Sequence, residues 1–499
     1  MDKTKLLAEF YDFLKEQSLI SNISSLLGWD QETIMPRGSG AGRVAQIEYV
    51  SRLYHKKRTD PKFLEIVDAL WEIKEELTED DSVNVREVKR DIDKTRKLPE
   101  DFVAHCSALH AKSNIVWQGA RKNNDWRSVE SLLTEIFKFA RERAELLGYS
   151  EHPYDALLDD YEPGAKISQT KTILLDLAER LRALMPAILE KQKSKATSSV
   201  TLKMSQEDQA KLCRKILNDI GFDFSKGRLD LSAHPFSTSI GKDDQRITYR
   251  FQDQYIASIY GALHEGGHAL YEIGLKSGDW HESVPLANTN SCALHESQSR
   301  FWENIIGRSL HFCRYLERII KDLKLTDVES FTAEKLWDDA NTVSPSLIRV
   351  EADEVTYSLH IVIRMLLEEK LLEGSLAVAD APEAWNDLYH RYLGLTPPNY
   401  ADGIMQDTHW YHGAIGYFPS YALGNIYGAH FTEKLKADLI GCSELVEKGK
   451  FAPIFDWLKQ NIHRFASRYQ PMELIERASG GMPVSSDAFV GYIQNKFLA

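Results

Sequence analysis

The sequence has few cysteines, no excess of basic residues and no long apolar run, and each shortage argues against a class of protein. It has five Cys among 499 residues and no Cys-x-x-Cys pair, so we expect free thiols in a reducing compartment and not a disulfide framework. Lys and Arg number 61 against 74 Asp and Glu, and no basic segment stands out, so we expect no nucleic-acid partner. No stretch approaches about 18 uncharged apolar residues, so we expect no membrane-spanning helix.

The sequence also lacks the marks of a leader or of separate domains. Residues 1–5 lead into an amphipathic segment without the apolar region of a secretory signal, so we expect a cytoplasmic protein. The length alone would allow two or three domains, but no linker rich in Gly, Ser or Pro and no repeat is visible. The most polar stretch, 192–201, is expected to be a loop.

What the sequence does contain is one helical pattern after another. Apolar residues at 6, 7, 10, 11, 13 and 14 follow a 3.6-residue period. The same spacing recurs in 63–77, 81–97, 100–124, 126–147, 170–191, 205–220, 291–306, 310–323, 332–339, 353–372, 382–393, 421–439, 444–448, 451–462 and 472–478. The exception is 228–251, where Thr, Ser, Ile and Phe surround a turn signal at 241–244, and there we expect a small antiparallel sheet. The sequence therefore predicts a mainly α protein.

A helical pattern at 252–263 runs directly into the most informative motif, His264-Glu265-Gly266-Gly267-His268. Positions i and i+4 share one face of a helix, so the two histidines can bind one zinc ion. Glu265 can then take a proton from the water that attacks a carbonyl. Glycine inside a helix costs roughly 1 kcal/mol relative to alanine. Gly266 and Gly267 therefore indicate a close approach, either by a substrate backbone or by a tightly packed neighbour.

Zinc in a hydrolase usually has three protein ligands and one position left for water. A third histidine farther along the motif is excluded, because the positions that would carry Gly and His are Tyr271 and Gly274. We therefore expect the third ligand to be Glu296, with Glu303 as the alternative. Glu296 lies in a polar cluster that could orient its carboxylate: His295, Ser297, Gln298 and Arg300.

Two further sets of residues fit peptide hydrolysis. A donor for the developing oxyanion could come from the nonperiodic segment 403–421, which holds His409, Tyr411, His412, Tyr417 and Tyr421. A free substrate carboxylate could be bound by Arg349 or Arg246. Composition and spacing do not choose between removal of terminal residues and cleavage inside a peptide.

Several motifs in one order give the sequence a strong resemblance to a known family. They lie at 29–36, 154–164, 234–236 (His-Pro-Phe), 244–248 (Asp-x-Arg-x-Thr), 264–268, 295–298 (His-Glu-Ser-Gln), 348–353 (Ile-Arg-x-x-Ala-Asp) and 403–410 (Gly-x-x-Gln-Asp-x-His-Trp). The chain resembles the zinc carboxypeptidases of the thermostable carboxypeptidase Taq family of bacteria and archaea.

The resemblance implies a single helical domain over residues 1–499, with a deep active-site groove like that of neurolysin and angiotensin-converting enzyme. It implies a homodimer that releases residues one at a time, with broad specificity, from the C-termini of peptides. One Zn²⁺ is expected per chain, and Co²⁺ or Mn²⁺ could replace it.

The resemblance also assigns roles to individual residues. His264, His268 and Glu296 resemble the metal ligands, and Glu265 resembles the general base. Arg349 resembles the residue that binds the substrate carboxylate. The segments 234–236, 244–248 and 403–410, which hold His234, Arg246, Gln406 and Asp407, resemble walls that close the groove. A looser similarity to the related oligopeptidases suggests His409 and Tyr417 as oxyanion donors. His412 is a rival to His409, and Tyr421 is a further candidate for substrate contact.

Two alternatives remain. The same metal chemistry in a groove with an open end would give an oligopeptidase that cuts short peptides internally. The second alternative is a helical scaffold that binds peptides without catalysis. The presence of Glu265 with three plausible metal ligands argues against this alternative.

Overall fold

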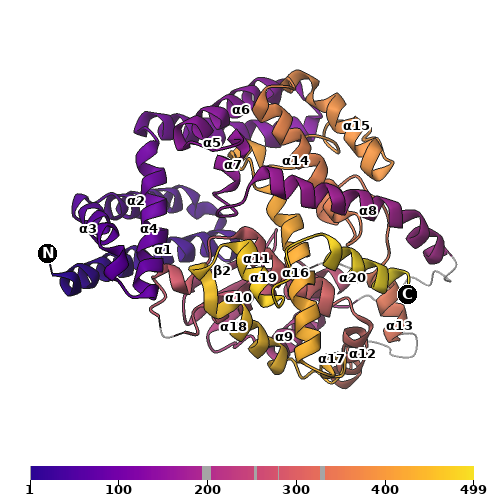
Figure 1. The fold of residues 1–499 in the computed structure, drawn as a ribbon. Helices are drawn as coiled ribbons and strands as arrows, with labels where there is room; N and C mark the ends of the chain where they lie inside the picture. Colours follow the sequence, from indigo (N-terminus) through magenta and orange to yellow (C-terminus); the bar gives the residue numbers. More distant parts are fainter. Residues whose placement is uncertain (1, 194–203, 252–254, 279, 326–331) are drawn as a thin grey trace.

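The computed structural model describes residues 2–193, 204–251, 255–278, 280–325 and 332–499, and this part of the chain is mainly helical (Figure 1). The α-helices are α1 (Lys3–Thr33), α2 (Gly40–Arg58), α3 (Pro61–Glu72), α4 (Glu79–Lys97), α5 (Glu100–Asn123), α6 (Arg127–Leu147), α7 (Pro153–Leu158), α8 (Ile167–Lys193), α9 (Gln206–Ile220), α10 (Tyr255–Leu275), α11 (Cys292–Arg300), α12 (Leu310–Leu323), α13 (Ala333–Ala340), α14 (Tyr357–Glu373), α15 (Ala381–Leu393), α16 (Phe418–Asp438), α17 (Cys442–Glu447), α18 (Ala452–Asn461), α19 (Pro471–Ala478) and α20 (Asp487–Phe497). The strands are β1 (Gly227–Leu231), β2 (Ser237–Gly241) and β3 (Asp244–Tyr249). The expected loop at 192–201 falls largely outside the described residues.

One large hydrophobic core joins most of the helices into a single domain, as expected. Helices α14 and α16 bury most of their residues, so they form its centre. Helix α10 packs against α9 and α11, and α11 packs against α16. The two segments that carry the site motifs, 264–268 and 295–298, therefore lie inside the core, where their positions are fixed by packing on several sides.

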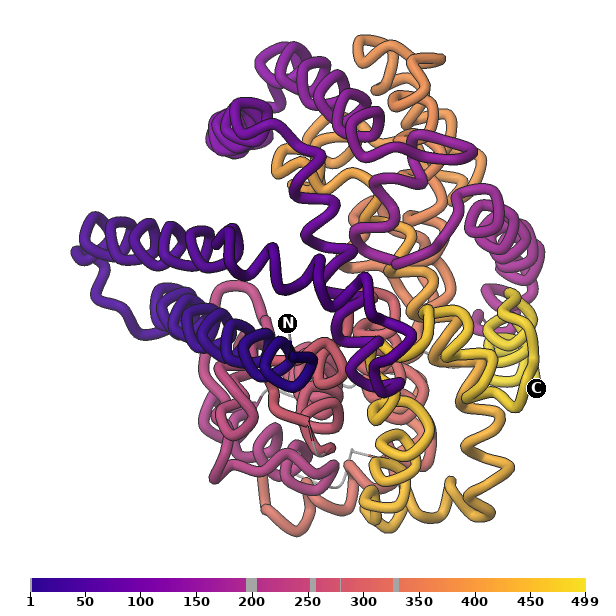
Figure 2. The backbone as a smooth tube through the Cα atoms, turned by 60° about the vertical axis from the view of Figure 1, so that its left-hand side comes forward, coloured from indigo at the N-terminus to yellow at the C-terminus, as the bar shows by residue number. Residues whose placement is uncertain are grey.

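A second, smaller core lies at the N-terminal side of the molecule. Leu6, Phe10 and Leu14 of α1 pack against Phe63 of α3 and Val85 of α4 there. The later part of α1 pairs with α2 in an antiparallel hairpin at the edge of the molecule (Figure 2), and α1 also packs on β2. Helix α2 buries none of its side chains, and its apolar residues do not form one stripe. For this reason the sequence did not predict it.

The sheet lies where the sequence predicted it, but it is mixed and not wholly antiparallel. The strand order is β1-β3-β2, with β3 antiparallel to β2 and parallel to β1. The turn after Gly241 reverses the chain between β2 and β3, while residues 232–236 carry the chain from β1 past β3 to the far edge. Strands β1 and β2 thus run in opposite directions but are not neighbours.

Side-chain hydrogen bonds hold this crossover to the sheet. Thr248 Oγ1 accepts from the backbone N–H of Phe236 at 2.9 Å, and Ser232 Oγ lies 2.7 Å from the same atom. Sheet residues of β2 and β3 pack on α10. The sheet therefore lies beside the helix that carries the histidine motif.

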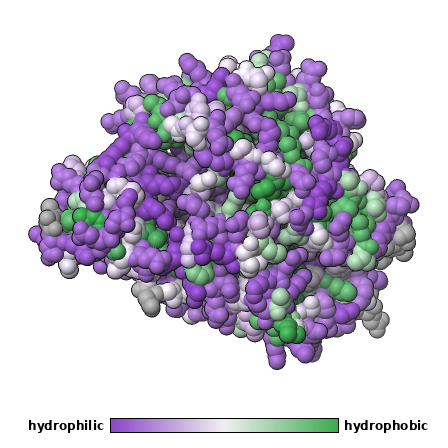
Figure 3. Space-filling view, in the orientation of Figure 1, coloured by the Kyte–Doolittle hydropathy of each residue, from purple (hydrophilic) through white to green (hydrophobic). Residues whose placement is uncertain are grey.

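No helix among the described residues is both long enough and apolar enough to cross a bilayer. The face drawn in Figure 3 is mostly hydrophilic, with hydrophobic residues in scattered groups.

Candidate metal centre and substrate-binding residues

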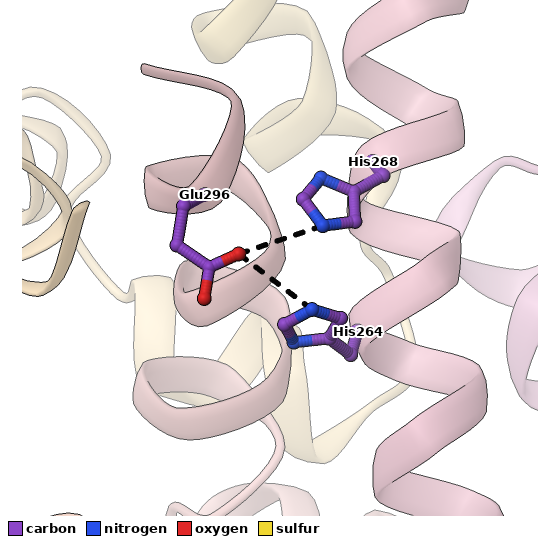
Figure 4. Close-up of side chains that lie close together, drawn as sticks. All are labelled: His264, His268 and Glu296. Atoms are coloured by element: carbon purple, nitrogen blue, oxygen red, sulfur yellow. Dashed lines mark ion pairs between the residues drawn. The ribbon is translucent and has the colours of Figure 1, made fainter. Parts of the chain in front are cut away.

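The histidines of α10 and the first glutamate of α11 meet at one point. His264 and His268 lie one turn apart on α10 and turn their Nε2 atoms toward α11 (Figure 4). Glu296 Oε2 lies 3.6 Å from Nε2 of His264 and 3.5 Å from Nε2 of His268. Glu303, the alternative ligand, is not part of this group.

The three atoms fit a divalent metal ion. Zinc bonds of about 2.0–2.2 Å in a tetrahedral arrangement place neighbouring ligand atoms about 3.3–3.6 Å apart. The separations of 3.5 and 3.6 Å are close to that value. Two imidazoles and one carboxylate are also the ligand set of many catalytic sites that keep a coordination position open.

Two glycines explain how the ligand helices come so close. A Cβ atom on Gly267 would lie 2.7 Å from the backbone of Gln298 and Ser299 in α11. A Cβ atom on Gly424 of α16 would lie 2.8 Å from the side chain of Glu296. Helix α11 is thus held between α10 and α16 at glycine contacts. Gly266 in turn faces Leu217 of α9, so both motif glycines serve tightly packed neighbours.

Glu296 and His264 are oriented by hydrogen bonds behind the centre. Arg300 Nε donates to Glu296 Oε1 at 2.7 Å, and Ser299 Oγ donates to Glu296 Oε2 at 2.9 Å. Glu303 Oε2 lies 2.9 Å from Nδ1 of His264. A carboxylate at Nδ1 keeps the proton on that nitrogen and leaves Nε2 free to bind a metal.

Position 303 belongs to a wider turn that the sequence did not predict. The helical pattern expected over 291–306 is an α-helix only as far as Arg300, and residues Phe301–Ile306 form a π-helix. Such turns recur at functional sites because they change the direction of a side chain within a helix. Glu303 lies in this turn, where it reaches His264 and also pairs with Arg300 and Arg308.

Glu265 lies beside the ligands and is buried, with 7% of its surface exposed. Burial raises the pKa of its carboxyl to about 7, with Glu296 adding to the shift and His264 opposing it. A carboxyl that titrates near neutral pH can both accept and return a proton.

The segment 403–421 brings three of its candidate donors together. His409 Nε2 lies 3.3 Å from the hydroxyl of Tyr421, and the rings of Tyr417 and Tyr421 pack edge to face at 5.0 Å. Burial lowers the pKa of His409 to about 4, although Asp407 opposes the shift, and burial raises the pKa of both tyrosines above the ordinary value. All three are therefore neutral at pH 7. His412 is exposed and lies 2.9 Å from Thr408 Oγ1, apart from this group.

Arg349 belongs to a buried charge cluster. Its Nε lies 3.0 Å from Asp407 Oδ1, and Arg364 Nε lies 2.6 Å from Oδ2 of the same carboxylate. Although burial opposes it, Arg364 and Arg349 hold the pKa of Asp407 well below its usual range. Two guanidinium groups share one carboxylate, so one positive charge is left over in a place where only 5% of Arg349 is exposed.

This cluster is connected to the metal centre by two side chains. Arg300, which holds Glu296, stacks over the ring of Tyr357 at 4.4 Å. Arg349 Nη1 in turn donates to the hydroxyl of Tyr357 at 3.1 Å. Gln406 supports the other side, because its Oε1 accepts from the backbone N–H of Arg349 at 2.9 Å.

The other sequence candidates lie on the sheet side. Arg246 pairs with Asp244 at 2.8 Å and stacks over Trp29 at 4.2 Å, so its guanidinium is already engaged. His234 is exposed in the crossover between β1 and β2. Of the two arginines considered for a substrate carboxylate, Arg349 is the one joined to the metal centre.

A groove lies beside the C-terminal end of α10, and the four metal-centre residues are not among the residues that line it. Its cavity measures about 500 Å³ and is bordered by α1, α4, α10 and β2. Its wall includes Glu272 of α10 and Lys276, which directly follows that helix; they come one and two turns after His268 in the sequence. A cavity of this size can hold several residues of a peptide.

Comparison with known proteins agrees with this site. Residues 9–497 match the Carboxypeptidase Taq (M32) metallopeptidase family. The chain is 39% identical to Thermostable carboxypeptidase 1 of Thermus thermophilus, over 98% of this chain and 97% of the relative. It is 34% identical to Carboxypeptidase 1 of Bacillus subtilis, with the same coverage.

Solved structures give the same result. The M32 carboxypeptidase from Deinococcus radiodurans superposes with a TM-score of 0.95 at 32% identity, covering 99% of each chain. The carboxypeptidase of Pyrococcus furiosus superposes with a TM-score of 0.94 at 35% identity, covering 100% of this chain and 99% of the other. The family match covers residues 9–497, the solved structures share the fold over nearly the whole chain, and three residues could hold a metal ion. The chain therefore belongs to the carboxypeptidase Taq family and is a metallocarboxypeptidase.

Proposed function

We propose that the protein is a zinc-dependent carboxypeptidase of broad specificity, which releases residues one at a time from the C-termini of peptides. The observation that carries the proposal is the convergence of His264, His268 and Glu296 on one point beside the buried Glu265. When bound there, a zinc ion supplies a Lewis acid that lowers the pKa of water to about 7 and polarises a carbonyl. Cobalt or manganese could replace zinc, since imidazole and carboxylate ligands accept them.

Glu265 is the proton carrier in this proposal. It takes the proton of the attacking water and returns it to the nitrogen of the leaving residue. Its buried position keeps bulk water away from this transfer, and the raised pKa suits a group that must work in both directions.

His409 and Tyr417 are the proposed donors to the developing oxyanion, with Tyr421 supporting both. Both side chains are buried and neutral, which favours this role. A neutral N–H or O–H group can donate a hydrogen bond to the oxyanion and still keep its proton. We assign no role to His412, because it is exposed and hydrogen-bonded to Thr408.

Arg349 is the proposed partner of the substrate's terminal carboxylate. The excess positive charge of the Arg349–Asp407–Arg364 cluster would be neutralised by a bound carboxylate, which supports removal of terminal residues over internal cleavage. Gln406 and Asp407 then act by holding Arg349 in place. Arg246 and His234 remain proposed wall residues on the sheet side, although neither lines the cavity beside α10.

The proposal also includes the partners, the location and the oligomeric state of the protein. Peptides are the expected partners, the cytoplasm is the expected location, and the active form is expected to be a homodimer. An oligopeptidase that cuts internally is the alternative, because it would use the same metal chemistry.

A pair of peptides separates the two functions. One peptide has a free C-terminal carboxylate, and the other has the same sequence with a C-terminal amide. We expect mass spectra over time to show stepwise loss of C-terminal residues from the free acid and little change in the amide, because the amide lacks the charge that Arg349 binds. Internal fragments from both peptides would instead support the oligopeptidase.

The role of Glu265 is tested by Glu265→Gln, which keeps the size of the side chain but removes its ability to accept a proton. We expect turnover to fall by at least 100-fold, in the range of general-base catalysis, while zinc content by elemental analysis stays at the wild-type level. Turnover within a few-fold of wild type would mean that another group accepts the proton.

A further inference from the structure

We propose that His295 and Glu272 are positioning residues, which hold His268 in the one orientation and tautomer that can bind the metal. The proposal rests on the proposed metallopeptidase function. It concerns residues that are not themselves ligands: His295 precedes Glu296 on α11, and Glu272 follows His268 by one turn on α10.

The three side chains form a continuous chain of short contacts. Nδ1 of His268 lies 2.5 Å from Nδ1 of His295. Nε2 of His295 lies 3.1 Å from Oε1 of Glu272. The chain starts and ends on α10, so His295 spans from one turn of that helix to the next.

One arrangement of protons satisfies every contact. Nε2 of His268 faces the metal position and must keep its lone pair, so the proton of the neutral ring is on Nδ1. Nδ1 of His295 must then accept that proton's hydrogen bond, because two N–H groups cannot face each other at this distance. The remaining proton of His295 is on Nε2, where it donates to Glu272. The carboxylate thus determines the tautomer of His268 through a second imidazole.

Neighbouring side chains restrict the movement of Glu272 and His295. Lys276, one turn beyond Glu272, is ion-paired with that carboxylate and is itself 5% exposed. The ring of Tyr271 packs edge to face on His295 at 5.4 Å. Both contacts restrict rotation of the residues that support His268.

The two histidine ligands are therefore supported differently. His264 meets the carboxylate of Glu303 directly, at 2.9 Å. His268 meets a carboxylate only through His295. The outer end of this longer chain, Glu272 with Lys276, is part of the wall of the groove, whereas Glu303 is paired with Arg300 and Arg308.

Metal affinity tests the proposal. His295→Phe keeps the planar ring and the backbone carbonyl of residue 295 but removes the side-chain acceptor for His268, and His295→Gln returns a side-chain acceptor oxygen. Competition with a chromophoric chelator should show a zinc dissociation constant raised by about 10- to 100-fold in His295→Phe, the usual cost of losing such a partner, and largely restored in His295→Gln. The absorption bands of the Co²⁺-loaded His295→Phe protein should also shift, because the imidazole of His268 is free to turn.

A second histidine–glutamate pair provides the matched control. His311 and Glu447 meet at 3.0 Å on the surface, between α12 and α17. His311→Phe should leave both the zinc dissociation constant and the Co²⁺ spectrum unchanged. Glu272→Gln tests the same chain without altering the core if His295→Phe does not fold, and we expect it to raise the dissociation constant about 10-fold.

The outcomes separate this inference from the proposed function. Wild-type affinity and an unchanged Co²⁺ spectrum in folded His295→Phe and Glu272→Gln would overturn the inference, even if the wild-type protein is an active carboxypeptidase. A wild-type protein that binds zinc but removes no C-terminal residue would contradict the proposed function, and the affinities of the variants would still decide the role of His295.

Discussion

Arg349 is suited to bind an anion because its positive charge is buried and only partly neutralised. Asp407 is shared between Arg349 and Arg364, so the cluster keeps one net positive charge. A charge removed from water in this way attracts a carboxylate strongly, since the local dielectric is low. The same cluster can lose Arg349 and still leave Asp407 paired with Arg364, so a change at this residue need not unfold the protein.

We therefore expect Arg349→Ala to act on substrate binding. Hydrogen bonds to charged groups contribute about 1.5–3 kcal/mol, so KM for a free-acid peptide should rise by about 10- to 100-fold. Steady-state kinetics on a short free-acid peptide measure this effect.

Arg246→Ala is the matched control, because Arg246 pairs with Asp244 and stacks over Trp29. It should change KM by only a few-fold. If Arg246→Ala raises KM strongly and Arg349→Ala does not, the carboxylate is bound at the sheet and not at the buried cluster.

At the scale of elements, the sequence was most informative where spacing along one helix decides the geometry. The positions of His264 and His268 follow from the helical period, and Glu296 was expected because a third ligand was needed nearby. The partner of His268 could not be predicted, because His295 reaches it across two helices. The π-helix that contains Glu303, the parallel pairing of β1 and the helix α2 were also missed, since none leaves a periodic pattern in the sequence.

Two of the glycines of α10, Gly267 and Gly261, provide a test of how closely its neighbours pack. In Gly267→Ala the new Cβ atom would lie 2.7 Å from the backbone of α11, so α11 must move and carry Glu296 away from the histidines. Overpacking of this kind costs about 1–3 kcal/mol, which urea unfolding would measure, and zinc affinity should fall as well.

Gly261→Ala is the control on the same helix, because a Cβ atom there meets no atom within 4 Å. It should leave stability unchanged or raise it by up to about 1 kcal/mol, as alanine favours the helix. Equal stability and equal zinc affinity in the two variants would show that α10 and α11 do not depend on the glycine contact.

At the scale of the molecule, the metal centre lies in the large core and the groove borders the smaller N-terminal core. Helices α10, α11 and α16 surround the proposed ligands, whereas α1 and α4 supply the opposite wall of the groove. The proposed metal ligands thus sit on packed elements, whereas the groove is shared with a separate core. This division would suit the proposed function, which needs a rigid metal site.

The position of the metal ion tests the account most directly. Crystals of the zinc-loaded protein, measured on both sides of the zinc absorption edge, should give one strong anomalous peak per chain. We predict that it lies about 2.0–2.2 Å from Nε2 of His264, Nε2 of His268 and Oε2 of Glu296. A peak bound by Glu303 in place of Glu296, or no peak between α10 and α11, would contradict the account.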